Sequence, residues 1–407
     1  MAFLTCIGFL ISFGIRCNMG VAILAMTKIN RNYTNFSSSK STNDSNRISN
    51  SSSCLSLPEF TWTSDVIGVV DSSFFWGYLI TQIPGGYLTS RLPANRIFGL
   101  AIGTSAFLNL LLPAAAKMHY GLVIAVRILQ GLAEGMNNPA CHGIWRYWAP
   151  KLERTKLATI SFCGMFSGAV LGMPISGILT KHFGWPAGFY AFGAMGMIWA
   201  VIFWFLSFEK PACNPYITQE ELIHIESSLG QSSSIINKNT PTPWLHFLKS
   251  MPVYAIIVEN FCASWTFFLM IVSQPRYITE VFHDDVEKSG MLSSLPYILL
   301  AIIIPIAGQI ADNLRKRLLT TTAVRKIFNC GGYGLEASFL LGVGMIRNET
   351  TAVICLMLAV GSSGLAVSGY SVNHLDIAPR YAAILLGLSN TFGSLAAIVC
   401  PIVTGML

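Results

Sequence analysis

Charged residues are scarce in this chain. They make up 11% of its 407 residues, whereas hydrophobic residues make up 53%. So low a charge content in a chain of this length excludes a water-soluble globular protein. The sequence instead predicts an all-α, multi-pass membrane protein whose outer surface contacts the lipid bilayer. The formal net charge of +7 does not indicate a nucleic-acid partner, because membrane proteins concentrate Lys and Arg on their cytosolic side.

Several kinds of functional site are also missing. The sequence contains no glycine-rich phosphate-binding loop, so ATP is not the expected energy source. No spacing typical of a metal site or of a nucleophile–base pair stands out, and we therefore expect neither an enzyme nor a cofactor. Of the ten cysteines, only Cys54 falls in a predicted outer loop, so no disulfide framework is predicted. The first 26 residues lack a cleavage signature and carry Arg16, which indicates a first span rather than a signal peptide.

Hydrophobic windows of about 20 residues, the length that crosses a bilayer, recur along the chain. Between the first two lies a Ser- and Asn-rich stretch, residues 29–65, which we interpret as a glycosylated luminal or extracellular loop. The predicted glycosylation sites are Asn32, Asn35, Asn43, Asn50 and, in a later loop, Asn348. The eleven predicted spans are residues 1–27, 66–90, 95–116, 121–145, 157–180, 185–207, 252–275, 290–311, 324–346, 350–372 and 380–407.

The distribution of basic residues predicts the same topology. With the N-terminus inside, the loops that carry the glycosylation sites lie outside, and the loops richest in Arg and Lys lie inside. A polar stretch at 209–250 reads as a cytosolic linker between a six-helix bundle, residues 1–208, and an incomplete five-helix bundle, residues 251–407. Gly86 and Gly308 each stand near the predicted end of a span, before a basic turn, which indicates a weak internal repeat of the kind two-bundle transporters show.

The fourth predicted span places three polar residues in an apolar helix. Arg127, Gln130 and Glu134 are three and four residues apart and share one helix face, with Arg127 and Glu134 about 10 Å apart. A charge at bilayer depth costs at least ~2.5–3.5 kcal/mol, so it usually faces a cavity or a partner. The polar residues in or near the ends of other predicted spans are Arg16, Asn18, Asp71, Gln82, Glu259, Asn260, Glu336, Asn373, His374 and Asp376.

Two interpretations of these groups stay open. They could be fixed ion pairs that tie helices together, which we favour for Glu336 and Asp376 near predicted helix ends. They could instead line a transport path, which we favour for Arg16, Arg127 and Glu134.

The chemistry of these residues points to an anionic substrate. An arginine offers a carboxylate or phosphate two parallel hydrogen bonds and stays charged. A buried glutamate suits proton coupling, because its proton affinity changes with its surroundings. Asp71 could share that role or neutralise an arginine. His142 lies two turns beyond Glu134 and is a further candidate on the proton route, and the ring of Tyr78 is a candidate to line the path.

Several long motifs resemble one family, the vesicular glutamate transporters. This family belongs to the anion:cation symporter branch of the major facilitator superfamily, with sialic acid and type I phosphate transporters as relatives. The resemblance covers nearly the whole chain except the Ser- and Asn-rich loop. The motifs are ISFGIRCN (11–18), SFFWGY (73–78), QIPGGY (82–87), RILQG (127–131), PACHGIW (139–145), SMPVYAIIV (250–258) and NHLDIAPRY (373–381).

The resemblance implies a two-bundle carrier of twelve helices that works by alternating access. It implies uptake driven largely by membrane potential, with phosphate transport and a chloride conductance also associated with the fold. The family's cavity arginines in the first and fourth spans fall on Arg16 and Arg127, and its fourth-span glutamate falls on Glu134. Asn18 and Tyr78 lie in the same motifs and are further substrate-binding candidates.

Three departures from the family qualify these expectations. Ala263 stands where the glutamate carriers have a second substrate-binding arginine, and Asp71 stands where they have a histidine. Glu259, one turn before Ala263 on the same helix face, is expected to make that side of the substrate cavity more negative and is a further proton-coupling candidate. Only eleven of twelve spans are found, from which we expect a fragment or an incomplete gene model.

We therefore expect a carrier of organic anions such as glutamate, or of inorganic phosphate, driven by membrane potential or by a proton or sodium gradient. A sialate- or phosphate-type symporter is the alternative within the family, and a non-transporting membrane scaffold or sensor is the alternative outside it. The expected partners are the anion, H⁺ or Na⁺, and the bilayer, with chloride a further candidate. The expected location is a synaptic or other intracellular vesicle membrane, or the plasma membrane.

Overall fold

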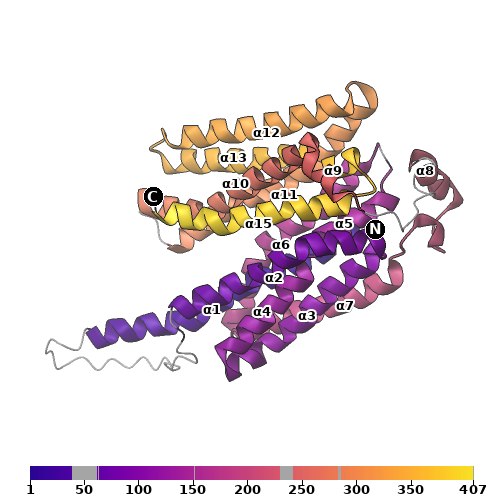
Figure 1. Cartoon of the computed structure of the whole chain (residues 1–407). Coiled ribbons are helices and arrows are strands. Elements are labelled where there is room, and N and C mark those ends of the chain that lie inside the picture. Colours follow the sequence, from indigo (N-terminus) through magenta and orange to yellow (C-terminus); the bar gives the residue numbers. More distant parts are fainter. Residues whose placement is uncertain (39–61, 63, 151, 230–241, 283–285, 407) are drawn as a thin grey trace, which may run out of the picture.

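The computed structural model describes residues 1–38, 62, 64–150, 152–229, 242–282 and 286–406. All regular secondary structure in these residues is helical, and no β-strand occurs among them. The N-terminus lies at the same end of the molecule as the short helices α8 and α9, and the C-terminus lies at the opposite end (Figure 1).

The first seven helices pack together as an N-terminal group, drawn in indigo to magenta (Figure 1). The helix α1 lies along α6 and α7, α2 lies along α4, and α3 packs between α4 and α7. The bounds are α1 (Ala2–Ser38), α2 (Ser64–Arg91), α3 (Ala94–Met118), α4 (Tyr120–Glu134), α5 (Asn137–Trp148), α6 (Arg154–Phe183) and α7 (Pro186–Leu206).

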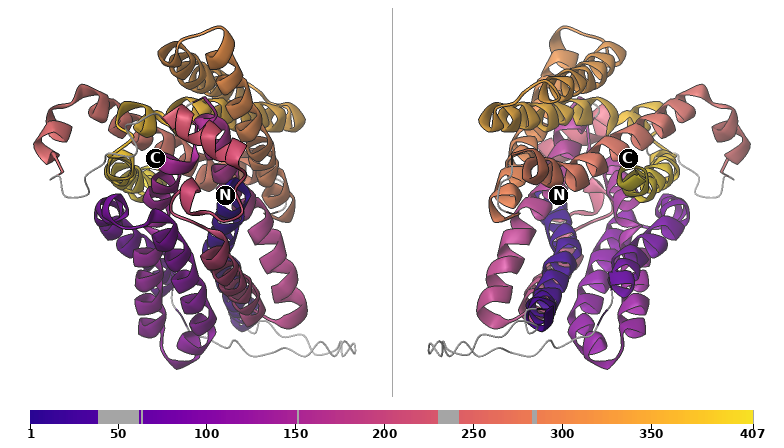
Figure 2. Two further views of the ribbon diagram at one scale, coloured as in Figure 1. Left: turned by 90° about the vertical axis from the view of Figure 1, so that its right-hand side faces the viewer. Right: turned by 90° about the vertical axis from the view of Figure 1, so that its left-hand side faces the viewer.

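The helices α10 to α15 form a C-terminal group, which lies beside the first one in all three views (Figures 1 and 2). The two groups meet where α2 and α5 contact α15 and where α6 contacts α11. Between the groups run a short 3₁₀ helix, η1 (Pro211–Cys213), and the helices α8 (Gln219–Leu229) and α9 (Trp244–Lys249). The later bounds are α10 (Met251–Phe282), α11 (Val286–Arg317), α12 (Thr321–Val343), α13 (Glu349–Tyr370), α14 (Asn373–Ile377) and α15 (Ala382–Met406).

Within the described residues, nine helices are long and apolar enough to cross a membrane. The chain is therefore a multi-pass membrane protein, and the predicted total of eleven spans stays a prediction. The helix α12 occupies the position of the predicted ninth span but is not among the nine, and it carries Arg325, Lys326 and Glu336. The predicted fourth span is not one continuous helix, because α4 ends at Glu134 and α5 begins at Asn137.

The end of the first helix differs from the sequence-based expectation. The helix α1 continues to Ser38, so Asn32 and Asn35 lie in a helix rather than in a loop that begins at residue 29. No Pro or Gly interrupts residues 28–38, so nothing in this stretch forces the helix to end. Asn43 and Asn50 lie outside the described residues, whereas Asn348 is exposed and its side chain caps α13 by accepting a hydrogen bond from the Thr351 backbone N–H at 3.4 Å.

Gly86 and Gly308 lie inside α2 and α11 and not at their ends. Each lies where the two helix groups cross. A Cβ atom on Gly86 would come within 2.5 Å of the Ala383 carbonyl oxygen of α15, and one on Gly308 would collide with Thr159 of α6. Each glycine thus permits a close contact at a crossing between the two helix groups.

Candidate functional site

The polar face of α4 is buried against α2 and α3. Arg127, Gln130 and Glu134 are 4%, 0% and 1% exposed. The backbones of α2 and α4 approach closely at Gly77 and Gly131, because a Cβ on Gly131 would collide with the Phe74 carbonyl oxygen of α2. Glycine is needed here to allow this approach. The crossing brings the rings of α2 next to the charges of α4.

Glu134 is fully paired. Its Oε2 accepts a hydrogen bond from Arg16 Nη2 of α1 at 2.9 Å, and its Oε1 accepts one from Ser105 Oγ of α3 at 2.6 Å. The Arg16 guanidinium also lies over the rings of Phe74 and Tyr78, at 4.6 and 5.0 Å from their centroids. Such cation–π contacts stabilise a charge that has lost water. The structure therefore brings together Arg16, Glu134 and Tyr78, three of the candidate site residues.

Arg127 is paired differently. Its Nη1 donates to Gln130 Oε1 at 3.4 Å, and its guanidinium lies 5.1 Å from the centroid of the Phe74 ring. Among the described residues, no carboxylate lies within ion-pair distance of it. Asp71, one turn before Phe74, interacts with Arg127 electrostatically at longer range and is itself exposed. Arg127 is thus a buried cation without a direct acidic partner in the described part of the chain, which is the state expected of an anion site before its ligand binds.

Next to the arginines, side-chain amides surround the hydroxyl of Tyr78, and we call this set the amide layer. The Tyr78 hydroxyl accepts hydrogen bonds from Asn138 of α5 at 3.2 Å and from Asn390 of α15 at 3.3 Å, and Asn390 also donates to Gln82 Oε1 at 2.9 Å. The amide layer joins the two helix groups. Sequence reasoning missed Ser105, Asn138 and Asn390. Asn390 could have been found as an amide inside an apolar span, whereas nothing distinguishes Ser105 in the sequence.

Asn18 and His142 do not join this site. Asn18 is fully buried against Gly188 of α7. His142 Nε2 lies 2.8 Å from the Ser371 carbonyl oxygen, and its ring centroid is 5.7 Å from that of His374. The break between α4 and α5 explains why His142 lies away from the site. The prediction placed His142 two turns beyond Glu134 on one continuous helix, and the two residues lie on separate helices.

The two predicted site residues on α10, Glu259 and Ala263, are not seen to join the arginine site. Glu259 accepts a hydrogen bond from the Tyr333 hydroxyl of α12 at 3.3 Å, so it lies within the C-terminal group rather than on the wall facing Arg127. Ala263 is half-buried. Its neighbours Asn260 and Ser264 face Gly393 of α15.

Asp376 is an ion-pair residue, as predicted. One of its carboxylate oxygens lies 2.8 Å from Arg325 Nη2, and the other lies 3.5 Å from Arg154 Nη1 and 3.9 Å from Arg315 Nη1. Arg154 begins α6 in the N-terminal group, whereas the other residues belong to the C-terminal group. The cluster therefore holds the two groups together at the end of the molecule where α8 lies. Glu336, predicted to act likewise, makes no ion pair with any described residue.

Comparisons with known proteins identify the class to which this fold and site belong. The chain matches the family model of the Major Facilitator Superfamily over residues 4–401. It also superposes on the E. coli fucose:proton symporter with a TM-score of 0.65 and 12% identity, covering 100% of this chain and 91% of that one. A proton:xylose symporter gives a TM-score of 0.66 and 12% identity, with 99% and 88% coverage. These two likenesses show the fold alone. The chain is a member of the major facilitator superfamily.

Its relatives within the superfamily are much closer in sequence. It is 52% identical over 410 residues to vesicular glutamate transporter 2 of Homo sapiens, a match that covers 100% of this chain and 68% of that protein. It is 50% identical to vesicular glutamate transporter 3 of Danio rerio, with 100% and 67% coverage. The chain therefore belongs to the family of the vesicular glutamate transporters, which confirms the resemblance seen in its motifs and the prediction of a carrier rather than an enzyme.

Proposed function

We propose that this protein is a secondary active transporter of anions that works by alternating access. The observation that carries the proposal is Arg127, a buried cation with no acidic partner at ion-pair distance in the described structure. A neighbouring second cation, Arg16, is 19% exposed in its side chain and can turn one edge of its guanidinium to a ligand. Two convergent guanidinium groups in a low-dielectric site suit a carboxylate or a phosphate. The relatives are vesicular glutamate transporters, and this supports the same substrate class.

The pairing of Arg16 with Glu134 supports a way to couple anion binding to a proton. In the structure Glu134 holds one edge of the Arg16 guanidinium. Protonation of Glu134 removes the negative charge from that pair and releases Arg16 for the anion. Anion and proton would then bind together and leave together. Asp71, electrostatically linked to Arg127, is the second candidate for a protonatable group, and Na⁺ and chloride remain candidate coupling ions.

The cytosolic cluster around Asp376 supports the alternating-access part of the proposal. It closes one end of the interface between the helix groups, with Arg154 on one side and Arg325 and Asp376 on the other. In the proposed cycle, these pairs separate when the groups rock against each other and give the anion access to the cytosol. The described helices would form eleven spans in two bundles, residues 1–208 and 251–407, joined by a cytosolic linker at 209–250. The 29–65 region, with its glycosylation sites, and Asn348 would lie on the luminal or extracellular side.

The identity of the anion depends on Ala263. A carrier that lacks an arginine there loses a charged hydrogen bond to a carboxylate, worth ~1.5–3 kcal/mol, or about ten- to a hundredfold in affinity. Glutamate is therefore bound weakly in this proposal, and sialate- or phosphate-type substrates compete with it. The relatives favour a vesicle membrane over the plasma membrane.

The test is uptake into proteoliposomes that contain the purified chain, under an imposed membrane potential, with glutamate, aspartate, sialate and phosphate offered in turn. Arg127→Ala is expected to abolish saturable anion uptake while expression persists. Arg317→Ala, which removes an exposed arginine at the end of α11, is the matched control and should leave uptake unchanged. Saturable uptake that survives Arg127→Ala would remove Arg127 from the site, and no saturable flux of any of the four anions would favour a scaffold or sensor.

A second variant tests the specificity argument. Ala263→Arg should raise the affinity for glutamate by about ten- to a hundredfold if a restored charged hydrogen bond reaches the substrate. An unchanged KM for glutamate would place the specificity elsewhere in the chain.

A further inference from the structure

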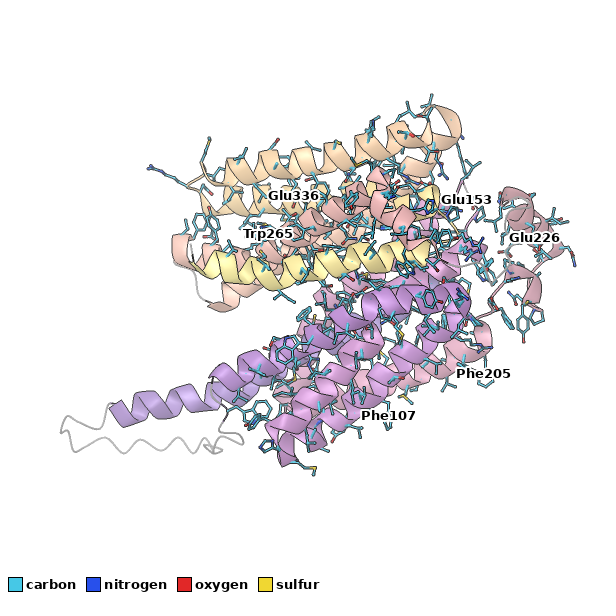
Figure 3. The ribbon with its side chains drawn as sticks, viewed as in Figure 1. Phe107, Glu153, Phe205, Glu226, Trp265 and Glu336 are labelled. Atoms are coloured by element: carbon cyan, nitrogen blue, oxygen red, sulfur yellow. The ribbon has the colours of Figure 1, made fainter. Side chains whose placement is uncertain are left out.

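A second set of acidic side chains lies inside the C-terminal group, apart from the arginine site. Glu259 of α10 and Glu336 of α12 lie on the two helices that also meet through Tyr333. The Tyr333 hydroxyl donates a hydrogen bond to Glu259 Oε1 at 3.3 Å, whereas Glu259 Oε2 is buried and has no hydrogen-bond partner among the described residues. Figure 3 labels Glu336 on α12, on the side of the molecule away from the N-terminal group.

Glu336 is buried more completely than Glu259. Its exposed fraction is 4%, and its Oε2 has no hydrogen-bond partner among the described residues. The groups that act on it electrostatically are the phenols of Tyr297 on α11, Tyr333 on α12 and Tyr370 on α13. The Tyr297 hydroxyl is also buried without a partner. Four helices thus converge on two carboxyl groups and three phenols, which we call the acidic cluster: Glu259, Tyr297, Tyr333, Glu336 and Tyr370.

The acidic cluster differs from the other buried acids in its charge balance. Glu134 is paired with Arg16, and Asp376 is paired with Arg325. No Lys or Arg that the structure describes lies within ion-pair distance of Glu259 or Glu336. A carboxylate buried without a cation costs several kcal/mol, so at least one of Glu259 and Glu336 must take up a proton or another monovalent cation.

We propose that Glu259 and Glu336 form a proton-binding site in the C-terminal group, separate from Glu134, and that this site carries a second coupling proton of transport. In the proton-loaded state one carboxylate becomes a carboxylic acid, and its O–H donates a hydrogen bond to another oxygen of the acidic cluster. In the unloaded state the proton has returned to water. The coupling part of the proposal rests on the anion transport proposed above, whereas the protonation itself does not.

A groove leads to the acidic cluster from outside. It has a volume of about 590 Å³, and Met251, Tyr254, Glu259, Asn329 and Tyr333 are among its lining residues. Met251 is the first residue of α10, next to the linker region, so the groove starts near the cytosolic end and reaches Glu259. Glu336 is not among the residues that line the groove. This difference supports Glu259 as the first group to exchange its proton.

Aromatic contacts connect the acidic cluster to the arginine site. The ring centroid of Tyr297 lies 6.0 Å from that of Phe267, and that of Phe268, the next residue, lies 6.5 Å from that of Phe75 on α2. Phe75 adjoins Phe74, over which both arginines lie. These rings span the interface between the helix groups and must repack when the groups rock. A change of charge in the acidic cluster can therefore bias the same movement that the anion biases.

The first experiment measures protonation without any transport. Infrared titration of the purified full chain in lipid should show the carbonyl stretch of a protonated carboxylic acid at neutral pH, which disappears only on alkalinisation. Glu336→Gln, close to the original in size, should lose this band, and Glu226→Gln, an exposed residue of α8, should retain it. Tyr333→Phe should shift the band without removing it, which guards against a variant that fails to fold. Absence of the band at neutral pH in the original chain, or its loss on adding Na⁺ at constant pH, overturns the proposal.

The second experiment tests coupling. In proteoliposomes, a pH gradient should stimulate anion uptake by the original chain, and Glu336→Gln should lose part of that stimulation while uptake driven by membrane potential continues. Equal stimulation in the two proteins overturns the coupling role. If neither protein moves any anion, the transport proposal fails, yet the infrared titration still decides whether the acidic cluster holds a proton.

Discussion

Arg16 and Arg127 lie side by side, yet their removal should affect the folded protein very differently. Arg16 pairs at 2.9 Å with Glu134, whose side chain has no exposed surface. Replacing Arg16 leaves that carboxylate buried with only Ser105 as a partner, and breaking a buried pair in this way costs ~3–5 kcal/mol. Arg127 has one long hydrogen bond to Gln130, at 3.4 Å, so its removal should cost no more than ~1 kcal/mol.

The comparison uses Arg16→Met and Arg127→Met, which keep most of the aliphatic volume of each side chain. The free energy of unfolding, measured by denaturant titration in detergent, should fall several times further for Arg16→Met. The double variant Arg16→Met/Glu134→Gln should recover part of the loss, because both charges of the pair are then gone. Equal losses for the two single variants would mean that Arg127 has an ionic partner in the folded chain, and the argument that it is open to an anion would fail.

Three further predictions concern other parts of the molecule. Asp376→Asn should open the interface at the end of the molecule where α8 lies and speed the labelling of introduced cysteines there by thiol reagents, whereas Glu153→Gln, which breaks only an exposed pair worth ~0–1 kcal/mol, should not. Gly131→Ala should lower the thermal unfolding midpoint, since overpacking costs ~1–3 kcal/mol, whereas Gly177→Ala has open space and should change little. Asn348→Gln should remove a glycan, seen as faster gel migration that glycosidase treatment no longer changes.

The general architecture could be predicted from the sequence because its signals are strong and local. Long apolar windows predicted most of the membrane helices, and the motifs predicted the family. Arg16, Arg127 and Glu134 could be placed together because each is a charge in an apolar helix, where chance placement is costly. The same reasoning found Asp376 as an ion-pair residue.

What the sequence could not predict depends on contacts between distant segments. The break after Glu134 coincides with Gly135, a helix-stop signal that the prediction of one continuous span did not use, and it moves His142 away from the arginines. The partner of Glu259 could not be predicted either, because a spacing of four residues put Glu259 and Ala263 on one face of α10 but did not show that Glu259 contacts Tyr333 of α12. Asn390 joins the site only because α15 crosses α2, a contact between residues far apart in the chain.

In the proposed transport cycle, the Asp376 cluster has a consequence for the surface that opens at its end of the molecule. Arg325 and Asp376 belong to the same helix group and can stay paired at 2.8 Å, whereas Arg154 belongs to the other group. Separation of the groups therefore leaves Arg154 as an uncompensated positive charge at the newly formed entrance. A cleft lined by one sign of charge concentrates ions of the opposite sign and speeds their arrival. The residue that closes the entrance would thus also attract anions to it once it opens.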